Sequence, residues 1–125
     1  MKKASRRWMD IAEEELAVAD SLLAAGRYLY AGFMAQQAAE KALKAVLQET
    51  MPVPPKVHDL EVLAQKANLD DQALAGKLAA LSEYYIATRY PDQREELGAK
   101  TTRQVAQGLL QTAREVSAWA TKRLS

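Results

Sequence analysis

Hydrophobic residues recur every three or four positions along most of this chain, which is the spacing of amphipathic helices. No stretch alternates apolar and polar residues with a period of two, so no strand is expected. The pattern predicts an all-α fold, an antiparallel up-and-down four-helix bundle with a short additional helix. The expected helices cover about residues 5–25, 28–50, 57–67 (the short one), 71–89 and 100–123.

The second predicted helix is unusually rich in alanine. Because small side chains let neighbouring helices approach closely, we expect it to be the central and most enclosed helix. Glu40 and Lys44 are four residues apart on it, and the spacing indicates a surface ion pair on its outer side. The alanines that are spread around this helix are Ala31, Ala35, Ala38, Ala39, Ala42 and Ala45.

Glycine and proline mark the breaks between the helices. Gly26 is placed to end the first helix in a left-handed conformation. Three prolines in residues 51–56 make that segment the longest expected connection. Asp70 or Asp71 is placed to cap the fourth helix, which Pro91 stops soon after Arg89. The polar residues 92–99 are predicted to form a loop with at most one helical turn.

Composition narrows the class of protein. With 125 residues and 49% hydrophobic content, residues 1–125 are expected to form a single domain with its own core. Seventeen basic and sixteen acidic residues leave a net charge of +1, so an anion site would have to be local. Cysteine is absent, which excludes thiolate chemistry. No signal peptide and no apolar run of roughly 20 residues is found, so we expect a cytoplasmic protein with no membrane partner.

His58 is the only histidine. A metal site with several histidines is therefore excluded, and we expect neither a metal nor another cofactor. One imidazole remains for acid–base chemistry. The alternative is that His58 caps the third helix or packs against the proline-containing segment.

Arg89 is expected at the end of the fourth helix, with Tyr85 one turn earlier. Its guanidinium presents a planar, permanently charged fork that suits a phosphate, and Tyr85 and Tyr90 offer rings for stacking on a base. The competing interpretation pairs Arg89 with Asp92 and places the tyrosines in the bundle.

A line of polar residues also runs along the second helix. Gln37, Lys41 and Lys44 share one face, which either borders a groove or is the solvated side of the helix. Basic residues at both ends of the chain offer weaker phosphate contacts. These are Lys2, Lys3, Arg6 and Arg7, with Lys122 and Arg123 at the other end.

Four features in this order resemble the HEPN family of small helical domains. They are Trp8, the segment Ala-Gln-Gln-Ala-Ala-Glu-Lys-Ala-Leu-Lys at residues 35–44, His-Asp-Leu at 58–60, and Tyr-Ile-Ala-Thr-Arg-Tyr-Pro-Asp at 85–92. The resemblance implies an all-helical bundle, commonly a homodimer, with a groove near Arg89. Many such proteins are encoded beside a minimal nucleotidyltransferase, and the pair can act as toxin and antitoxin.

Active members of the wider family are similar to metal-independent endoribonucleases in which four to six residues separate the arginine from a following histidine. Here Arg94, Glu95 and Glu96 occupy that spacing after Arg89. Arginine stabilises charge but does not move a proton, so the missing histidine favours a binding module for a nucleotide, an RNA phosphate or a partner nucleotidyltransferase. Two alternatives stay open: a ribonuclease that uses Arg89 with His58 or Glu95, and a purely structural interaction module. The binding residues expected are Arg89, Tyr85, Tyr90, Asp92, Lys41 and Lys44.

We expect the protein to be a homodimer in solution. The expectation rests on the resemblance and on the surplus of aromatic and apolar positions along the first, fourth and last predicted helices. Light scattering at micromolar concentration should give twice the mass of the 13.8 kDa chain. The mass of one chain would contradict it.

Overall fold

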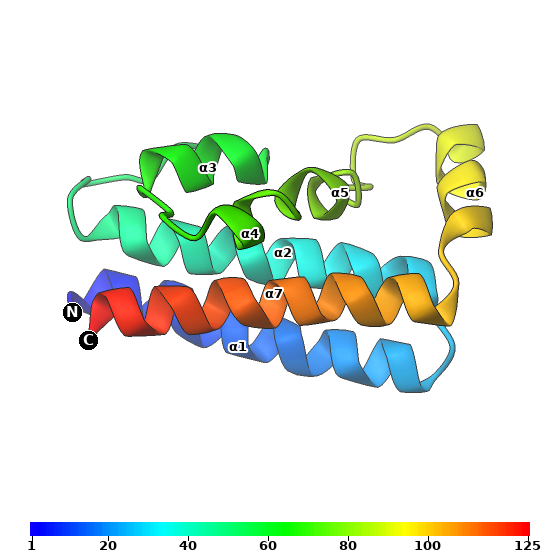
Figure 1. Cartoon of the computed structure of the whole chain (residues 1–125), viewed down its shortest axis with the longest axis horizontal. Helices are drawn as coiled ribbons and strands as arrows, with labels where there is room; N and C mark the ends of the chain where they lie inside the picture. The colour runs from blue at the N-terminus through cyan, green and yellow to red at the C-terminus, as the bar shows by residue number, and fades with distance from the viewer.

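Three long helices lie side by side in the computed structural model, which describes all of residues 1–125 (Figure 1). A layer of three short helices packs over α2 and α7, and one further helix stands across the end of the bundle away from the termini. The long helices are α1 (Lys3–Ala24), α2 (Tyr28–Gln48) and α7 (Arg103–Leu124). The short ones are α3 (Leu60–Lys66), α4 (Gln72–Ala75), α5 (Leu78–Ser82) and the transverse α6 (Pro91–Lys100).

The chain direction alternates through α1, α2, the α4–α5 pair and α7, while α3 is inserted between the second and third of these (Figure 1). Both termini therefore lie at the same end of the molecule. The all-helical, up-and-down bundle expected from the sequence is confirmed. One cluster of 25 buried residues, contributed by every helix, forms the core.

Helix α2 lies at the centre, as its alanine content predicted. Twelve of its 21 residues are buried, because alanine and Gly32 let the neighbouring helices approach on several sides. The prediction of a surface pair between Glu40 and Lys44 is wrong for the same reason. Glu40 is 2% exposed and Lys44 6% exposed, so the ion pair is enclosed.

The predicted fourth helix is not continuous. It is divided into α4 and α5 at Gly76 and Lys77, and α5 ends at Ser82 rather than near Arg89. Leu74, Leu78 and Leu81 are buried as their spacing predicted, but Tyr84 and Ile86 enter the core beyond them. The chain leaves the helix after Ser82, and this change of direction allows both residues to be buried.

The prediction of a loop over residues 92–99 is also wrong, because α6 occupies it. Pro91 begins this helix and does not end the previous one, which stops at Ser82; proline suits the first turn because the N–H that it lacks would have had no partner there. The side chain of Gln93 accepts a hydrogen bond of 3.3 Å from the backbone N–H of Tyr90. Leu97 and Thr101 then anchor the end of α6 in the core.

Side-chain caps fix where the short helices begin. Asp59 Oδ1 accepts hydrogen bonds from the backbone N–H groups of Glu61 and Val62, so α3 starts at Leu60 and His58 lies just before it. Asp71 caps α4 through the N–H of Leu74 at 3.0 Å. Gly26 adopts φ 77° at the end of α1, as predicted.

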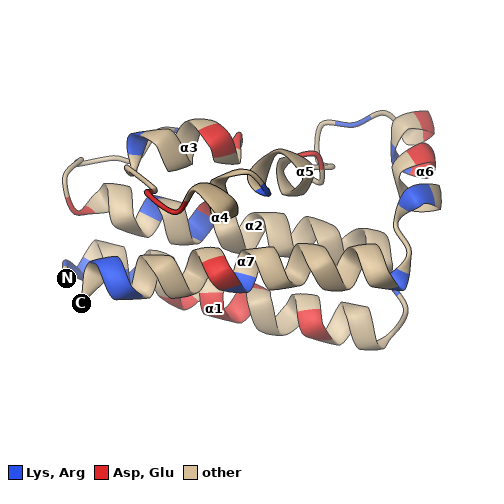
Figure 2. Ribbon diagram, in the orientation of Figure 1, with Lys and Arg blue, Asp and Glu red and all other residues tan.

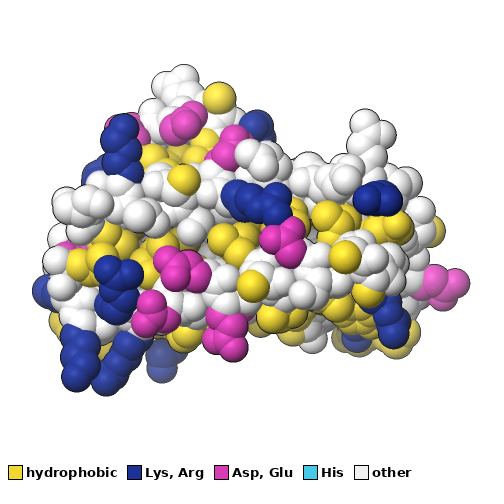
Figure 3. Space-filling view, turned by 90° about the horizontal axis from the view of Figure 1, so that it is seen from below, with side chains coloured by type: hydrophobic (Ala, Val, Ile, Leu, Met, Phe, Trp, Pro, Cys, Tyr) yellow, Lys and Arg dark blue, Asp and Glu magenta, His cyan; other side chains and the backbone are white.

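Charge is unevenly distributed over the surface. Acidic residues dominate the outer turns of α6, and basic residues gather where the termini lie (Figures 2 and 3). Helices α2, α3 and α7 all end there, and the partial negative charge of their last carbonyls favours cations such as Lys66, Lys122 and Arg123. The C-terminal ends of these three helices therefore account for part of the positive charge at this end of the bundle. None of the helices combines the length and the hydrophobicity that crossing a bilayer requires.

Gly32 and Gly108 allow the central packing to be tested. A Cβ at Gly32 would lie 2.7 Å from Tyr84 Cδ2 and 3.2 Å from Leu109 Cδ1, whereas one at Gly108 meets nothing within 4 Å. Because a hydrogen bond of 2.6 Å to Thr101 holds Tyr84 in place, Gly32→Ala should lower the free energy of unfolding by about 1–3 kcal/mol.

The matched control, Gly108→Ala, should raise the free energy of unfolding by about 0.5–1 kcal/mol through helix propensity alone. Urea denaturation of both variants measures the two effects. Equal stabilisation by both substitutions would show that α2 is packed less tightly than the structure has it.

Candidate functional site

A buried carboxylate, Glu40, lies at the middle of the candidate site. Its side chain is 3% exposed, and the ammonium of Lys44 donates to Oε2 at 3.0 Å from the next turn of α2. The amide of Gln36 donates to Oε1 at 3.2 Å from the preceding turn. Paired in this way with a cation and an amide, the carboxylate tolerates enclosure.

His58 closes over this carboxylate from outside α2. Its Nδ1 lies 3.1 Å from both oxygens of Glu40, and Gln36 also donates to its backbone carbonyl at 3.2 Å. The two nitrogens of an imidazole lie on different edges of the ring, so Nε2 faces away from Glu40. The side chain of His58 is 46% exposed. One edge of the ring is thus held by a buried anion, while nearly half of the side-chain surface remains exposed.

Tyr85 supports the imidazole from the segment that follows α5. The two rings are stacked, with centroids 4.1 Å apart and planes inclined by 11°. Phe33 of α2 lies on the Tyr85 ring at 6.3 Å in a tilted arrangement. Because Tyr85 is already engaged with His58 and Phe33, it acts as a support for His58 rather than as a free platform for a base.

A hollow of about 350 Å³ opens beside this stack. Its lining is almost entirely polar and comes from the start of α3, the end of α5, the segment before α6 and the first turn of α6. The residues are His58, Asp59, Ser82, Tyr85, Thr88, Arg89 and Gln93.

Arg89 reaches the hollow from the turn between α5 and α6. Its Nε and Nη2 both donate to the backbone carbonyl of Glu83, the former at 3.1 Å. One edge of the guanidinium is thereby fixed, and the side chain lines the hollow together with His58. The structure therefore brings Arg89, Tyr85 and His58 together.

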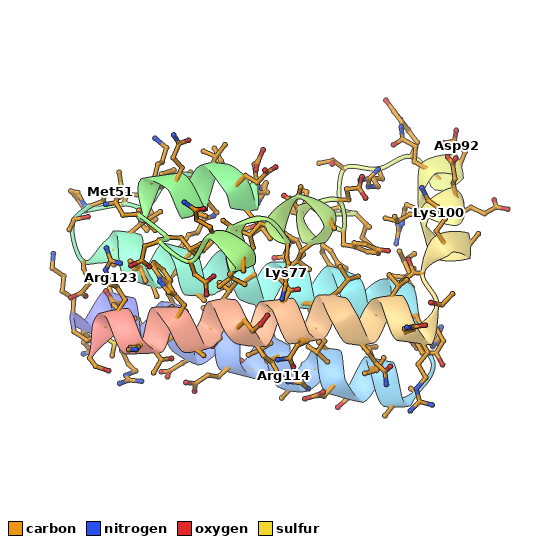
Figure 4. The ribbon with its side chains drawn as sticks, viewed as in Figure 1. Met51, Lys77, Asp92, Lys100, Arg114 and Arg123 are labelled. Carbon is orange, nitrogen blue, oxygen red and sulfur yellow. The ribbon has the colours of Figure 1, made fainter.

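The other predicted binding residues lie elsewhere. Tyr90 is 72% exposed, and Asp92 points away from the bundle at the outer end of α6 (Figure 4). Lys44 lies beneath the site with Glu40, and its Nζ is 5.8 Å from the ring centroid of Trp8. Glu95 is exposed on α6 and does not line the hollow.

Lys41 belongs to a polar line that continues along α2 from the site. Its ammonium donates to Gln37 at 2.9 Å and lies 3.2 Å from Glu15 of α1. Burial raises the pKa of Glu15 above its usual value, although Lys41 acts in the opposite direction. Gln37 in turn donates to Gln36 at 2.9 Å. This side of α2 is therefore a hydrogen-bonded seam and not a solvated face.

The pattern of the sequence did not identify Glu40 and Gln36 as site residues. A spacing of four residues on a helix fits a partner on the surface as well as a buried one. Only the tertiary structure, in which His58 lies against Glu40, shows that these residues are buried. Ser82 was also missed, although its hydroxyl accepts a hydrogen bond of 3.1 Å from the backbone N–H of Leu60 and so ties α3 to α5. The usable signal was the three short segments Glu40-Lys41, His58-Asp59 and Arg89-Tyr90, which belong to the motifs noted in the sequence.

The hollow brings together three kinds of functional group. Arg89 supplies a permanent positive charge, His58 supplies an oriented imidazole, and Ser82 and Thr88 supply hydroxyl groups at the wall. No group of three or more histidine, aspartate or glutamate side chains has the geometry of a metal site. The arrangement can hold an anion and accept or donate a proton at Nε2 of His58.

Lys44 allows the burial of this site to be tested. Lys44→Met removes the ammonium from a carboxylate that is 3% exposed, so we expect the free energy of unfolding at neutral pH to fall by about 3 kcal/mol. Lys77→Met is the matched control, because Lys77 and its partner Glu115 form an ion pair of the same length, 3.0 Å, with side chains that are 51% and 35% exposed, so the loss should be below about 1 kcal/mol. Chemical denaturation followed by circular dichroism measures both. Similar losses in the two variants would contradict the special position of Glu40.

Comparison with known proteins agrees with this architecture. The sequence model of the HEPN domain matches residues 5–124. A crystal structure of TT1696 from Thermus thermophilus is 30% identical, covers 98% of this chain and 99% of that one, and superimposes with a TM-score of 0.83.

ST0689, described as an archaeal HEPN homologue, shares the fold at 23% identity, with full coverage of both chains and a TM-score of 0.77. No curated protein matches the chain. Because the family pattern extends over nearly its whole length, the chain belongs to the HEPN domain family.

Proposed function

We propose that the protein binds a phosphate-bearing ligand, a nucleotide or an RNA segment, in the hollow between His58 and Arg89. The observation that carries this proposal is the shared lining of one polar hollow by a guanidinium and an imidazole. Guanidinium groups form charge-assisted hydrogen bonds with phosphate oxygens. The fixed edge of Arg89 on the carbonyl of Glu83 lowers the entropy that is lost when a ligand is held.

The size and polarity of the hollow favour the same ligand class. A volume of about 350 Å³ accommodates a nucleotide, whereas the scarcity of apolar lining disfavours a lipid or an aromatic metabolite. Asp59 also lines the hollow, but its Oδ1 is committed to the first N–H groups of α3. Its negative charge favours a ligand that carries hydroxyl or amide donors beside the phosphate.

A second candidate is metal-independent cleavage of RNA, and the position of His58 favours it. The family's histidine is missing after Arg89, yet the fold places another imidazole in the same hollow. In such a reaction the 2′-hydroxyl loses its proton to His58, the 2′-oxygen bonds to phosphorus, and the 5′-oxygen leaves with a proton from water. Arg89 would stabilise the charge that develops on the phosphorus oxygens.

Family membership also supports a proposal about assembly. We propose that the protein is a homodimer and associates with a minimal nucleotidyltransferase as part of a toxin–antitoxin pair. Ile11 and Val18, both 39% exposed and one heptad apart on α1, provide apolar area for such contacts. In the purely structural alternative, the wild-type protein binds no ligand, and Arg89→Ala changes the mass of the assembly.

The binding proposal is tested with a fluorescent RNA ten-mer of mixed sequence in the presence of a chelator. We expect Arg89→Gln to weaken binding by about 10- to 100-fold, because one or two charge-assisted hydrogen bonds are lost. Arg94→Gln is the matched control, since Arg94 donates to the hydroxyl of Tyr30 at 3.0 Å and lies outside the lining of the hollow. It should change the affinity by less than about twofold.

The same samples are examined for cleavage products. Chelator-resistant cleavage that is lost in both Arg89→Gln and His58→Ala would establish the ribonuclease candidate. Binding without cleavage would support the binding module alone. An equal effect of Arg89→Gln and Arg94→Gln, or no binding by folded protein, would reject the hollow as a phosphate site.

A further inference from the structure

Seven basic side chains from three separate segments lie at the end of the bundle where both termini are found (Figures 2 and 3). All seven are exposed, and none of them forms an ion pair with a carboxylate. We call this group the terminal cluster. Its members are Lys2, Lys3, Arg6 and Arg7 at the start of the chain, Lys66 in the last turn of α3, and Lys122 and Arg123 in the last turn of α7.

Two carboxylates lie in hollows at this end, and both are engaged by neutral donors. Glu49 accepts hydrogen bonds from the hydroxyl of Ser5 and, at 2.8 Å, from the backbone N–H of Lys2. Asp70 accepts a hydrogen bond of 3.0 Å from the indole of Trp119. These hydrogen bonds lower the pKa of both carboxyl groups, so both are ionised at neutral pH. Neither of them takes a lysine or arginine side chain out of the terminal cluster.

The helix ends do not neutralise the terminal cluster either. The C-terminal end of a helix carries about half a negative charge, so α2, α3 and α7 together offset roughly one and a half of the seven cations. Even with the two carboxylates included, an excess of positive charge remains. Because the whole chain has a net charge of only +1, this excess is a local concentration of the kind that attracts a polyanion.

An aromatic ring lies among these cations. The guanidinium of Arg123 is 5.3 Å from the centroid of the Trp119 ring. Both side chains line a hollow of about 250 Å³ together with Asp70 and Lys122. Arg123 also lines a second hollow of about 250 Å³, which reaches the ends of α2 and α3 (Figure 4). An aromatic ring that is surrounded by cations is the combination that holds a base by stacking and its phosphates by charge.

We propose that the terminal cluster binds the backbone of a single-stranded nucleic acid, with either sugar, and that one base of the strand lies against Trp119. This goes beyond the function proposed above, because it concerns another face of the molecule and involves neither His58 nor Arg89. Asp70 disfavours a phosphate inside its hollow but accepts a hydrogen bond from an N–H at the edge of a base. An acidic peptide would match the charge and leave Trp119 and Asp70 without a role.

The first experiment measures the binding of a fluorescent thymidine DNA twenty-mer at several salt concentrations. The logarithm of the association constant should fall by roughly 0.7 per phosphate contact for each unit of the logarithm of salt concentration. The variant Arg7→Gln/Lys66→Gln/Lys122→Gln removes one exposed cation from each segment. It should lower this slope by about two and weaken binding by roughly 10- to 100-fold at low salt.

The matched control is Arg27→Gln/Lys100→Gln/Arg103→Gln, which removes three cations from the opposite end of the bundle. They too are exposed and have no carboxylate partner, so the net charge changes equally. The control should change the affinity by less than about twofold, because charges on the far side are screened. Equal weakening by both triple variants would overturn the proposal. Binding that is lost in Arg89→Gln and kept in the first triple variant would also overturn it and leave the hollow at His58 standing.

The second experiment separates a nucleic acid from an acidic protein. Poly-glutamate of the same length should displace the labelled strand at least tenfold less well than unlabelled thymidine DNA, and a uridine RNA should displace it about equally well. Competition by poly-glutamate at equal concentration would overturn the proposal and assign an acidic protein to this end.

The chain has two tryptophans, so Trp8→Phe leaves Trp119 as the only one. Thymidine DNA should quench the fluorescence of Trp119 in this variant, and binding without quenching would overturn the contact with a base. Should Trp8→Phe fail to fold, the competition by poly-glutamate decides the question.

Discussion

The burial of Glu40 is the constraint on which the candidate site depends. A carboxylate enclosed among alanine-rich helices is tolerable only if every oxygen is engaged by a donor. Lys44 and Gln36 satisfy it from the same helix, and His58 does so from another part of the chain. No buried side-chain nitrogen or oxygen is left without a partner. The position of the segment before α3 is thus set by electrostatics as well as by packing.

The placement of His58 determines the rest of the hollow. The imidazole offers a flat surface on which Tyr85 stacks, and this contact brings the segment after α5 back toward α2. Arg89 follows four residues later and is held by the carbonyl of Glu83. The position of Arg89 therefore depends on Glu40, although Arg89 does not contact the carboxylate. Three segments that are far apart in the sequence form one connected unit.

The hydrophobic pattern determined the outline of the fold. The spacing of apolar residues is sufficient to indicate α1, α2 and α7, because α1 and α7 each have a stripe that only a bundle can bury and α2 is apolar on several sides. The prediction of one continuous fourth helix, over residues 71–89, was wrong. Leu74, Leu78 and Leu81 fit such a helix, but the burial of Tyr84 and Ile86 requires a different direction of the chain. The polar segment of α6 carries almost no hydrophobic signal, with Leu97 as its one buried residue. Helix α6 is stabilised by the proline at its start and by the packing of its C-terminal end against the core.

The sequence by itself determined the helical class, the central place of the alanine-rich helix and the candidacy of His58, Arg89 and Tyr85. These follow from local properties: side-chain size, periodicity and the chemistry of rare residues. Only the tertiary structure decided that Glu40 and Lys44 are buried, that Tyr85 supports His58, and that Arg89 shares a hollow with the single histidine. Spacing on one helix does not say which face another segment will cover. That choice is made by contacts between residues 18 or more positions apart in the chain, and it is these contacts that create the site.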